Sequence, residues 1–445
     1  MRLINIIALL AHAAAAPIDG VDALLRTYVK EHASVSAAAV RADPCARRFV
    51  SADFWGKGLG NSVNVALNAL AFAVAANRTL LVSDDARFRA GFWKYLGAVE
   101  GRWALKSTVL EAFVQADGCR KCGGCINGAP DVLRDFFPMN RNCLQSKSCG
   151  PGVRWMLCDQ RALSANDAPV VHVRSAVTWL APLILENKGL EPFIRARLER
   201  LFPHKANSWG ALYGTLLDPQ PEVSLTHPLR SLLLEHAEAF DLGLHVRHRR
   251  AQPLDAVDAH AAKCAAKALQ GVPRPKIFVA TDRPSRLPGL FLRIERALGR
   301  PCDFRSLNAS RVPMATRLRL HSVARLDEKA MRAGRDWGEH AHERWTAAAD
   351  FFLLSRSRRV VGTLSSSYSE LAAAARGASE AWLFDPVQQF KGRKRARYNW
   401  PRSDEYLEGA AGCRRSDAAW PLPQYVRLRP EEGRAWVARG NCDVE

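Results

Sequence analysis

Several features that define common protein classes are missing from this sequence. It contains no Gly-x-Ser-x-Gly elbow, no Walker phosphate loop and no His-Glu-x-x-His motif, so a serine hydrolase, a P-loop nucleotidase and a zinc protease have no support. Beyond residue 16 there is no uninterrupted apolar run of about 18 residues, the length that favours a membrane-spanning helix. No internal repeat or low-complexity tract is visible. The chain therefore has to be interpreted from strand ends, helix starts and cysteines.

Acidic residues are scarce relative to basic ones. The 445 residues include 64 Lys and Arg against 44 Asp and Glu, a formal net charge of +20. This surplus indicates an anionic partner such as a phosphate, a nucleotide, a nucleic acid or a sulfated glycan. The basic residues are mostly Arg in an Ala-rich chain, which GC-rich coding also produces, so charge does not choose among these partners. With 48% hydrophobic residues the chain can bury a large core, and its length predicts two domains.

The first 16 residues have the layout of a secretory signal peptide. Arg2 is followed by an apolar run at 3–10 and then by small residues. We therefore expect export into the secretory pathway, in the Golgi or ER lumen or beyond the cell, with no stable membrane span. An uncleaved short anchor is the alternative. The sequons at Asn77 and Asn308 are compatible with a lumenal location.

Eleven cysteines fit an oxidising compartment better than a reducing one. Seven fall within the first 158 residues, and Cys119, Cys122 and Cys125 have a spacing that a zinc knuckle could use. No His or fourth Cys follows at the distance typical of a tetrahedral site, so disulfides are favoured over zinc. The pairing cannot be deduced from the sequence, and the odd total leaves one thiol without a partner.

The first half of the chain shows one alternation of helix and strand. An amphipathic pattern at 21–40 predicts a helix, and a glycine-rich turn at 56–60 precedes an apolar helix at 63–76. A short apolar run at 79–82 is typical of a buried strand. Turn, helix and strand in this order indicate an α/β sheet.

A second alternation begins near residue 240 and has the period of a Rossmann-type domain. The predicted strands are 242–246, 276–280, 359–362 and 381–384, and the predicted helices are 255–269, 287–298, 342–355 and 367–376. The fold class expected from both halves is α/β.

These patterns divide the chain into four expected segments. They are a signal peptide at 1–16, an N-terminal α/β domain at 41–235 with a cysteine-rich loop at 118–158, a C-terminal Rossmann-type domain at 236–400, and a tail at 401–445.

Glycines stand ahead of the apolar helix in the first half. Gly58, Gly60 and Asn61 would let the backbone approach a ligand closely and aim helix N–H groups at it. A turn that needs positive φ explains such glycines equally well. The pair Asp84 and Asp85 suggests a metal only weakly, because paired acids are common in loops, and no metal is expected.

Charged residues follow two strands of the second half. Arg247 comes at the carboxyl end of the strand at 242–246, where open α/β sheets bind ligands and where a guanidinium suits a phosphate. Arg249 and Arg250 are interpreted as part of a solvated turn. Asp282 follows the next strand, where it could accept from a ribose hydroxyl or a base, or cap a helix.

Hydroxyl groups follow a third strand. Ser365 and Ser366 lie in the run Gly-Thr-Leu-Ser-Ser-Ser at 362–367, ahead of a predicted helix. Hydroxyls and N–H groups at a helix start can bind phosphate, while ordinary capping by Ser is the alternative. Together with Arg247, this run predicts a phosphate site.

These segments, in this order, resemble the GDP-fucose-dependent fucosyltransferases of the GT-B type. The similar runs are GKGLGNSVNVALNALAFAVAANRTLLV from Gly56, LGLHVR from Leu242, KIFVATDRPS from Lys276 and WTAAADFFLLSRSRRVVGTLSSSYSELAAAA from Trp345. LGLHVR resembles the His-x-Arg motif of the α1,6- and protein O-fucosyltransferases. VVHVRSAVTWLAPLILENKG from Val170 and RLFPHKANSWGALYG downstream are more similar to the plant xyloglucan α1,2-fucosyltransferases. The resemblance implies two Rossmann-type domains facing across a cleft, with the acceptor on the side of the N-terminal domain and the GDP-sugar bound by the C-terminal domain.

The resemblance also implies roles for individual residues. Arg247 would bind the β-phosphate of GDP, with Ser365 and Ser366 helping, and the glycine segment with Gly58, Gly60 and Asn61 would contact the donor. Asp282 and Asp350 would contact the nucleoside, and His245 would shape the pocket. Asp255 stands ten positions after His245, where the α1,6 family has an acidic residue, and is the candidate general base.

The chain departs from the family pattern at two places. Where the α1,6 family continues Arg-Thr-Asp-Lys, this chain has His248, Arg249, Arg250 and Ala251. The plant family has Gln in place of His245. These differences leave the acceptor and the subfamily open.

The leading hypothesis is inverting, metal-independent transfer of fucose from GDP-fucose to a glycan or glycoprotein hydroxyl, with no nucleic-acid partner. A fixed guanidinium and a helix start would stabilise the leaving diphosphate, and a carboxylate such as Asp255 would take the acceptor proton. The rival hypothesis is a secreted lectin-like or polyanion-binding protein that uses the basic runs at 245–250 and 391–397. A third keeps the fold with another donor or without activity.

Overall fold

The structure is a computed structural model in which two compact units are described. The described residues are 20–32, 35–52, 59–82, 104–122, 169–173, 185, 190–202, 211–212, 215–216, 240–248, 254–306, 350–351, 353–363, 366–376, 381–384 and 413–415. The C-terminal unit is made mainly of residues 221–424, and the N-terminal unit mainly of residues 17–57 and 61–220. The expected signal peptide at 1–16 and the domain limits at residues 235 and 400 lie outside the described residues.

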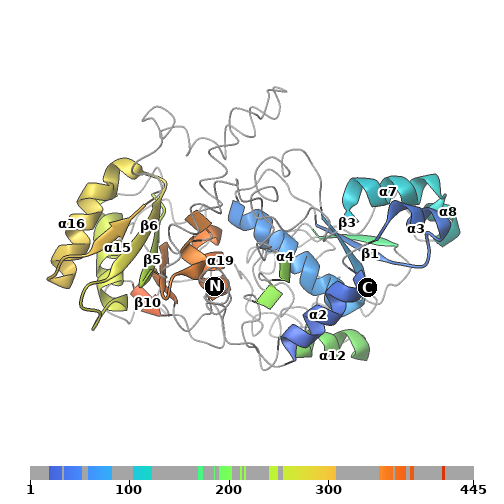
Figure 1. The fold of residues 1–445 in the computed structure, drawn as a ribbon, viewed down its shortest axis with the longest axis horizontal. Coiled ribbons are helices and arrows are strands. Elements are labelled where there is room, and N and C mark those ends of the chain that lie inside the picture. The colour runs from blue at the N-terminus through green and yellow to red at the C-terminus, as the bar shows by residue number, and fades with distance from the viewer. Residues whose placement is uncertain are drawn as a thin grey trace, which may run out of the picture. The chain divides into compact units, whose positions relative to one another are not determined.

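The N-terminal unit is built on a parallel sheet with strand order β3-β2-β1-β4 (Figure 1). Its strands are β1 (Phe49–Ala52), β2 (Thr79–Val82), β3 (Ala104–Leu105) and β4 (Val170–Val173). Its helices are α2 (Val21–His32), α3 (Ala37–Ala42), α4 (Leu59–Ala76), α7 (Lys106–Gln115), α8 (Gly118–Cys122) and α12 (Pro192–Leu201).

Helix α4 is buried in this unit because its sequence is mostly apolar and carries no charge. Its 18 residues contain no proline and no charge, and residues 63–75 are buried throughout. The helix ends at Asn77, which has a φ of 53°, and Arg78 N donates to Ala73 O at 2.9 Å to close the last turn. Within the described part of the chain no helix has both the length and the apolarity to cross a membrane.

The C-terminal unit contains a six-stranded sheet with order β10-β9-β8-β5-β6-β7. Its strands are β5 (Leu242–Val246), β6 (Lys276–Thr281), β7 (Asp303–Arg305), β8 (Val360–Thr363), β9 (Ala381–Phe384) and β10 (Cys413–Arg415). All neighbours are parallel except β10, which pairs antiparallel with β9. The helices are α15 (Leu254–Ala268), η4 (Pro284–Arg286), α16 (Leu287–Leu298) and α19 (Ser367–Arg376).

Strand β5 is covered on both faces, which explains why it is a continuous apolar run. Leu242, Leu244 and Val246 belong to the core cluster formed with α15 and α16. Figure 1 shows these helices on one side of the sheet and α19 on the other, where His245 contacts α19. Gly243 allows the second face to close, because a Cβ there would lie 2.6 Å from Ser357 Oγ.

The sequence pattern predicts this unit well. The strands at 242–246 and 381–384 and the helices at 287–298 and 367–376 have the observed bounds. In the N-terminal unit the helix expected at 21–40 is two helices, and Ser36 starts the second by accepting a hydrogen bond from Ala39 N at 3.1 Å. The outcome confirms the α/β class with parallel sheets.

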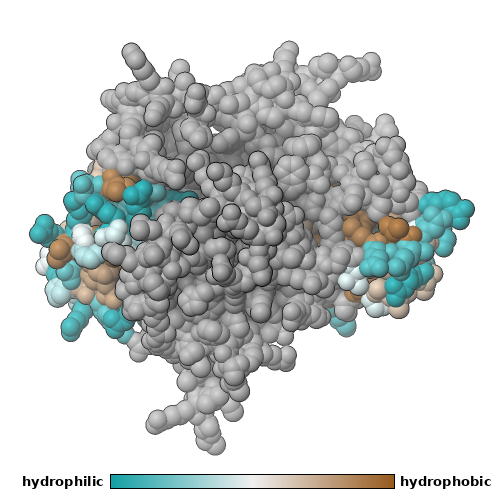
Figure 2. All heavy atoms as spheres, turned by 90° about the horizontal axis from the view of Figure 1, so that it is seen from above, coloured by the Kyte–Doolittle hydropathy of each residue, from teal (hydrophilic) through white to brown (hydrophobic). Residues whose placement is uncertain are grey.

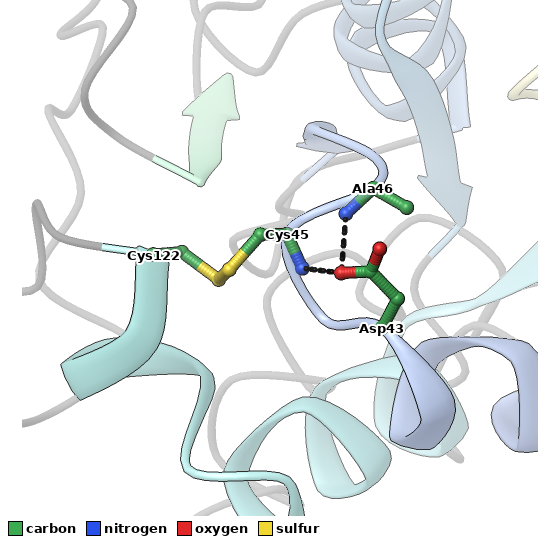
Figure 3. Close-up of a disulfide and its surroundings, with 4 residues drawn as sticks. All are labelled: Asp43, Cys45, Ala46 and Cys122. Atoms are coloured by element: carbon green, nitrogen blue, oxygen red, sulfur yellow. Dashed lines mark hydrogen bonds between the residues drawn. A yellow bond between two sulfur atoms is a disulfide. The ribbon is translucent and has the colours of Figure 1, made fainter.

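Two disulfides are present among the described residues. Cys45 is bonded to Cys122, one of the three closely spaced cysteines, and Asp43 accepts from the backbone N–H of Cys45 beside it (Figure 3). Cys264 on α15 is bonded to Cys413 on β10. Cys122 is therefore a disulfide partner, in line with the preference for disulfides over zinc. The expected tail contributes β10 to the sheet, whereas the sequence suggested no strand there.

The described surface in Figure 2 is largely hydrophilic with small apolar patches. Exposed large apolar side chains include Val114, Phe193 and Leu292. The guanidinium of Arg197 lies 4.5 Å from the ring centroid of Phe193 and covers part of this exposed ring. None of these single side chains forms a docking surface.

Candidate functional site

The candidate site lies at the carboxyl ends of β5, β6 and β8. Strand β5 is flanked by β6 on one side and β8 on the other, so the chain order reverses between β5 and β8. In open α/β sheets, ligands bind outside the strand ends at such a switch point. The residues that follow these strands are therefore the first candidates for a ligand site.

Arg247 directly follows β5 and is held at two points. Its backbone N–H donates to Thr363 Oγ1 at 2.8 Å, and that hydroxyl donates to the carbonyl of His245 at 3.2 Å. Its Nε lies 3.2 Å from Asp282 Oδ2 in an ion pair. The Arg247 side chain is 42% exposed, so the guanidinium is oriented by Asp282 and still reaches solvent.

His248 is enclosed by carboxylates. Its Nδ1 lies 3.1 Å from Asp282 Oδ1 and its Nε2 lies 2.7 Å from Asp258 Oδ1, with the side chain fully buried. Its backbone N–H also donates to Asp282 Oδ1 at 2.8 Å. Burial by itself would lower the pKa of His248, but the hydrogen bonds and charges of Asp258 and Asp282 outweigh it and raise the pKa above its ordinary value.

Asp258 connects this histidine to an arginine. The Nε and Nη2 atoms of Arg286 lie 2.8 and 2.5 Å from Asp258 Oδ2. Arg286 also donates to Asp255 Oδ1 at 2.6 Å, and Arg293 donates to the same oxygen at 3.0 Å. Positive and negative side chains thus alternate from Arg247 along the sheet edge.

Asp255, the expected general base, is an exposed partner of two arginines. Its side chain is 73% exposed. The hydrogen bond from Arg286, together with the charges of Arg286 and Arg293, lowers the pKa of Asp255 below its usual value. A carboxylate held in its charged form in this way is a weaker base, so the geometry does not favour this role.

His245 and Asp350 are both buried. His245 Nδ1 lies 2.5 Å from Ser369 Oγ, and its ring centroid lies 4.8 Å from that of Tyr368. Within the described part of the chain, Asp350 Oδ1 has no hydrogen-bond partner. Burial raises the pKa of Asp350 well above its usual range, which favours the neutral carboxyl.

Helix α19 begins next to Thr363, and Ser366 immediately precedes it. Ser366 N–H donates to Thr363 O at 3.2 Å, and Ser366 is 9% exposed. The helix start therefore lies beside the carboxyl end of β8, as the hydroxyl run predicts. Ser365 lies outside the described residues.

The structure thus joins several predicted residues through contacts. Arg247 contacts Asp282 directly, and Thr363 links it to His245 and to the start of α19. Gly60 and Asn61 lie in the first turn of α4, and Gly58 lies outside the described residues. Among the described residues, no group of three or more His, Cys, Asp or Glu could hold a metal ion.

Sequence reasoning missed His248, Asp258 and Arg286. His248 stands at the start of a basic run and received no role from the sequence, but its side chain is buried between two carboxylates. Asp258 and Arg286 lie 10 and 38 positions further along the chain, in α15 and η4. The one available signal was the departure from the family motif at His248.

Residues 168–382 match the model of a family of unknown function (DUF7810). No curated protein sequence matches the chain.

Among solved structures, a mutant FUT1 from Arabidopsis thaliana in complex with GDP has a TM-score of 0.51 at 14% identity, covering 84% of this chain and 81% of that one. Fucosyltransferase NodZ from Bradyrhizobium has a TM-score of 0.37 at 14% identity, covering 76% and 95%. POFUT1 in complex with GDP has a TM-score of 0.35 at 11% identity, covering 75% and 96%. The chain is structurally similar to GDP-fucose fucosyltransferases across most of its length, a likeness of fold.

Proposed function

We propose that this protein is a glycosyltransferase of the GT-B type that transfers fucose from GDP-fucose to a glycan or glycoprotein hydroxyl, with inversion and without a metal ion. The observation that carries the proposal is Arg247 at the switch point of the six-stranded sheet, oriented by Asp282 and Thr363. The similarity in fold to FUT1 supports it. The disulfides fit the expected setting in the secretory pathway, in the Golgi or ER lumen or outside the cell.

The chemical argument concerns the leaving group. As the bond to fucose breaks, negative charge develops on the β-phosphate of GDP, and a pre-oriented donor stabilises that charge without reorganising. Arg247 uses Nε for Asp282, and the Nη side of the guanidinium fork is suited to phosphate oxygens. Ser366, Ser365 and the N–H groups at the start of α19 would add further donors.

Nucleoside recognition is assigned to a buried carboxyl group. Burial raises the pKa of Asp350 and favours its neutral form, and Oδ1 lacks a partner among the described residues, so this carboxyl group would exchange hydrogen bonds with a base. His245, whose ring lies 4.8 Å from that of Tyr368, would shape the donor pocket. Asp282 already forms an ion pair with Arg247 and accepts from His248, so its proposed role includes orienting the phosphate ligand. The donor contacts of Gly58, Gly60 and Asn61 remain part of the proposal.

The polyanion-binding hypothesis is weaker in the light of this geometry. It requires the run at 245–250 to form an exposed basic strip. His245 and His248 are 6% and 3% exposed, so both are withdrawn from the surface. The run at 391–397 lies outside the described residues.

The test is GDP release from GDP-fucose by the purified full chain with a panel of glycan and glycoprotein acceptors, with and without a chelator. Arg247→Ala is expected to lower turnover by about 10²–10³-fold, as loss of a charge-stabilising donor does. Arg358→Ala is the matched control, because it removes an arginine that pairs with Asp241 at the amino ends of the strands. Absence of GDP binding by the wild-type protein would overturn the proposed function, and chelator-sensitive turnover would contradict its metal independence.

A further inference from the structure

We propose that His248 is a positioning residue: as a buried imidazolium it holds Asp282, and through Asp282 the guanidinium of Arg247, in the geometry that binds the diphosphate. The inference rests on the assignment of Arg247 as the phosphate ligand. It adds that nucleotide binding depends on the protonation of a side chain that touches no substrate.

The first step is the number of protons that the contacts require. Both ring nitrogens of His248 face carboxylates, at 3.1 Å from Asp282 Oδ1 and 2.7 Å from Asp258 Oδ1. A carboxylate only accepts hydrogen bonds, and a neutral imidazole carries a single N–H. Both contacts are therefore hydrogen bonds only when the ring is doubly protonated.

The second step is how the histidine reaches Arg247. Asp282 uses its two oxygens on two different partners: Oδ1 accepts from His248, and Oδ2 pairs with Arg247 Nε. The carboxylate plane is thereby set by His248 at one end and sets the guanidinium at the other. Because the Arg247 side chain is 42% exposed, Asp282 is the described contact that limits its rotamers.

The third step is what the loss of a proton does. Thr281 Oγ1 lies 3.3 Å from His248 Nδ1, so in the neutral ring Nδ1 can accept from this hydroxyl while Nε2–H stays on Asp258. The proton on Nδ1 leaves to solvent, and Asp282 Oδ1 then faces the lone pair of His248 Nδ1 instead of an N–H donor. Asp282 keeps the backbone N–H of His248 but loses the ring as a partner, which loosens Arg247.

The charged groups around His248 come from every described element packed there. They are Arg247 after β5, Asp282 after β6, Asp255 and Asp258 on α15, Arg286 in η4 and Arg293 on α16. The two carboxylates that contact the ring each also pair with one arginine. Without the imidazolium, the central positive charge of this alternating series is absent.

An arginine at this position would remain charged at every accessible pH, as in the Arg-Thr-Asp-Lys continuation of the family motif. Histidine places there a cation that can lose its proton. An arginine in its place would therefore not give this pH dependence.

The experiment measures GDP affinity by calorimetry for the full chain between about pH 5.5 and 8.5. GDP itself titrates in this range, since a terminal phosphate has a pKa near 6. The quantity to compare is therefore the ratio of variant to wild-type dissociation constants at each pH, in which the titration of the ligand cancels.

His248→Gln is expected to weaken GDP binding about ten- to a hundredfold at low pH, the range seen when the orienting partner of a metal ligand is removed. The ratio should fall toward one as the pH rises and the wild-type ring loses its proton. His32→Gln is the matched control, because it removes a buried histidine from the N-terminal unit and should leave the ratio at one.

Asp258→Asn is a second variant that tests the inference even if His248→Gln does not fold. It keeps an oxygen near Nε2 but removes one of the charges that stabilise the imidazolium. The pH at which GDP affinity weakens should therefore move downward. A His248→Gln ratio that is constant across the pH range would overturn the inference while leaving Arg247 as the phosphate ligand. No GDP binding by the wild type at any pH would overturn the proposed function and this inference together.

Discussion

Each unit buries a histidine at an end of its parallel strands, and the pKa values of the two histidines are shifted in opposite directions. His248 contacts two carboxylates at the carboxyl edge of β5 and β6. His32 contacts the Thr79 hydroxyl at 3.2 Å and the Asn77 side-chain oxygen at 3.3 Å, at the amino end of β2. Burial lowers the pKa of His32, and the nearby charges of Arg47 and Arg197 act in the same direction.

The contrast teaches that partners, more than burial, decide the charge of an enclosed histidine. Glu31 lies 3.9 Å from His32 Nε2, but its side chain is 55% exposed and does not reverse the direction. At the carboxyl edge of the C-terminal sheet the partners are ionised and form the candidate site. At the amino edge of the N-terminal sheet they are neutral, and the cluster serves the fold.

The largest losses of stability are expected when the disulfide of either unit is removed. Cys264–Cys413 spans 149 residues and Cys45–Cys122 spans 77. By loop-closure entropy each contributes roughly 4–5 kcal/mol, the longer loop by about 0.6 kcal/mol more. Serine pairs at each position, followed by urea unfolding, would measure both losses. Equal losses, or a larger loss at 45 and 122, would contradict the loop-length argument.

Two hydroxyl deletions compare the units at a smaller scale. Tyr28 OH donates to Arg78 O at 2.9 Å and accepts from Leu80 N at 3.0 Å, while Thr363 Oγ1 links Arg247 N and the His245 carbonyl. Tyr28→Phe and Thr363→Val should each lower the free energy of unfolding by about 1–3 kcal/mol in chemical denaturation, because each removes the hydroxyl that bonds two backbone groups. Only Thr363→Val should also weaken GDP binding. A loss of GDP affinity in Tyr28→Phe would break the distinction between a structural and a site hydroxyl.

The pH dependence of stability should have opposite signs in the two units. The folded pKa of His32 is lowered, so its contribution is present above its unfolded pKa of about 6.5 and is lost as the pH falls toward the folded pKa. The folded pKa of His248 is raised, so its contribution is fully present below that unfolded value and is lost as the pH rises through the folded pKa.

Hydrogen exchange read by mass spectrometry can follow each unit separately, through peptides covering β2 and β5. Acidification from pH 7 should speed opening around β2, after correction for intrinsic exchange rates. His32→Gln should remove this acid sensitivity and His248→Gln the sensitivity of β5 to alkali. We expect this to be the smallest of the three effects near neutral pH, and the same sign in both units would refute the assignment.

Local pattern sufficed for most elements of the C-terminal unit, but not for strands β7 and β10. The amphipathic period at 287–298 and the apolar run at 242–246 each indicate a type and a length, because a helix and a buried strand need those residues wherever they pack. Strand β10 could not be predicted, since three residues reading Cys-Arg-Arg carry no apolar pattern. It becomes a strand by pairing with β9 and by the bond from Cys413 to Cys264.

The candidate site likewise has a part that the sequence predicts and a part that it does not. The amino-acid sequence by itself determined that Arg247 and Asp282 follow parallel strands, and strand ends of one sheet meet at one edge whatever the rest of the chain does. Only the tertiary structure decided that His248 faces inward and that Asp258 and Arg286 reach it from α15 and η4. The charge of a buried imidazole depends on which carboxylates the fold brings within about 3 Å of it, and that is a property of packing between segments distant in the chain.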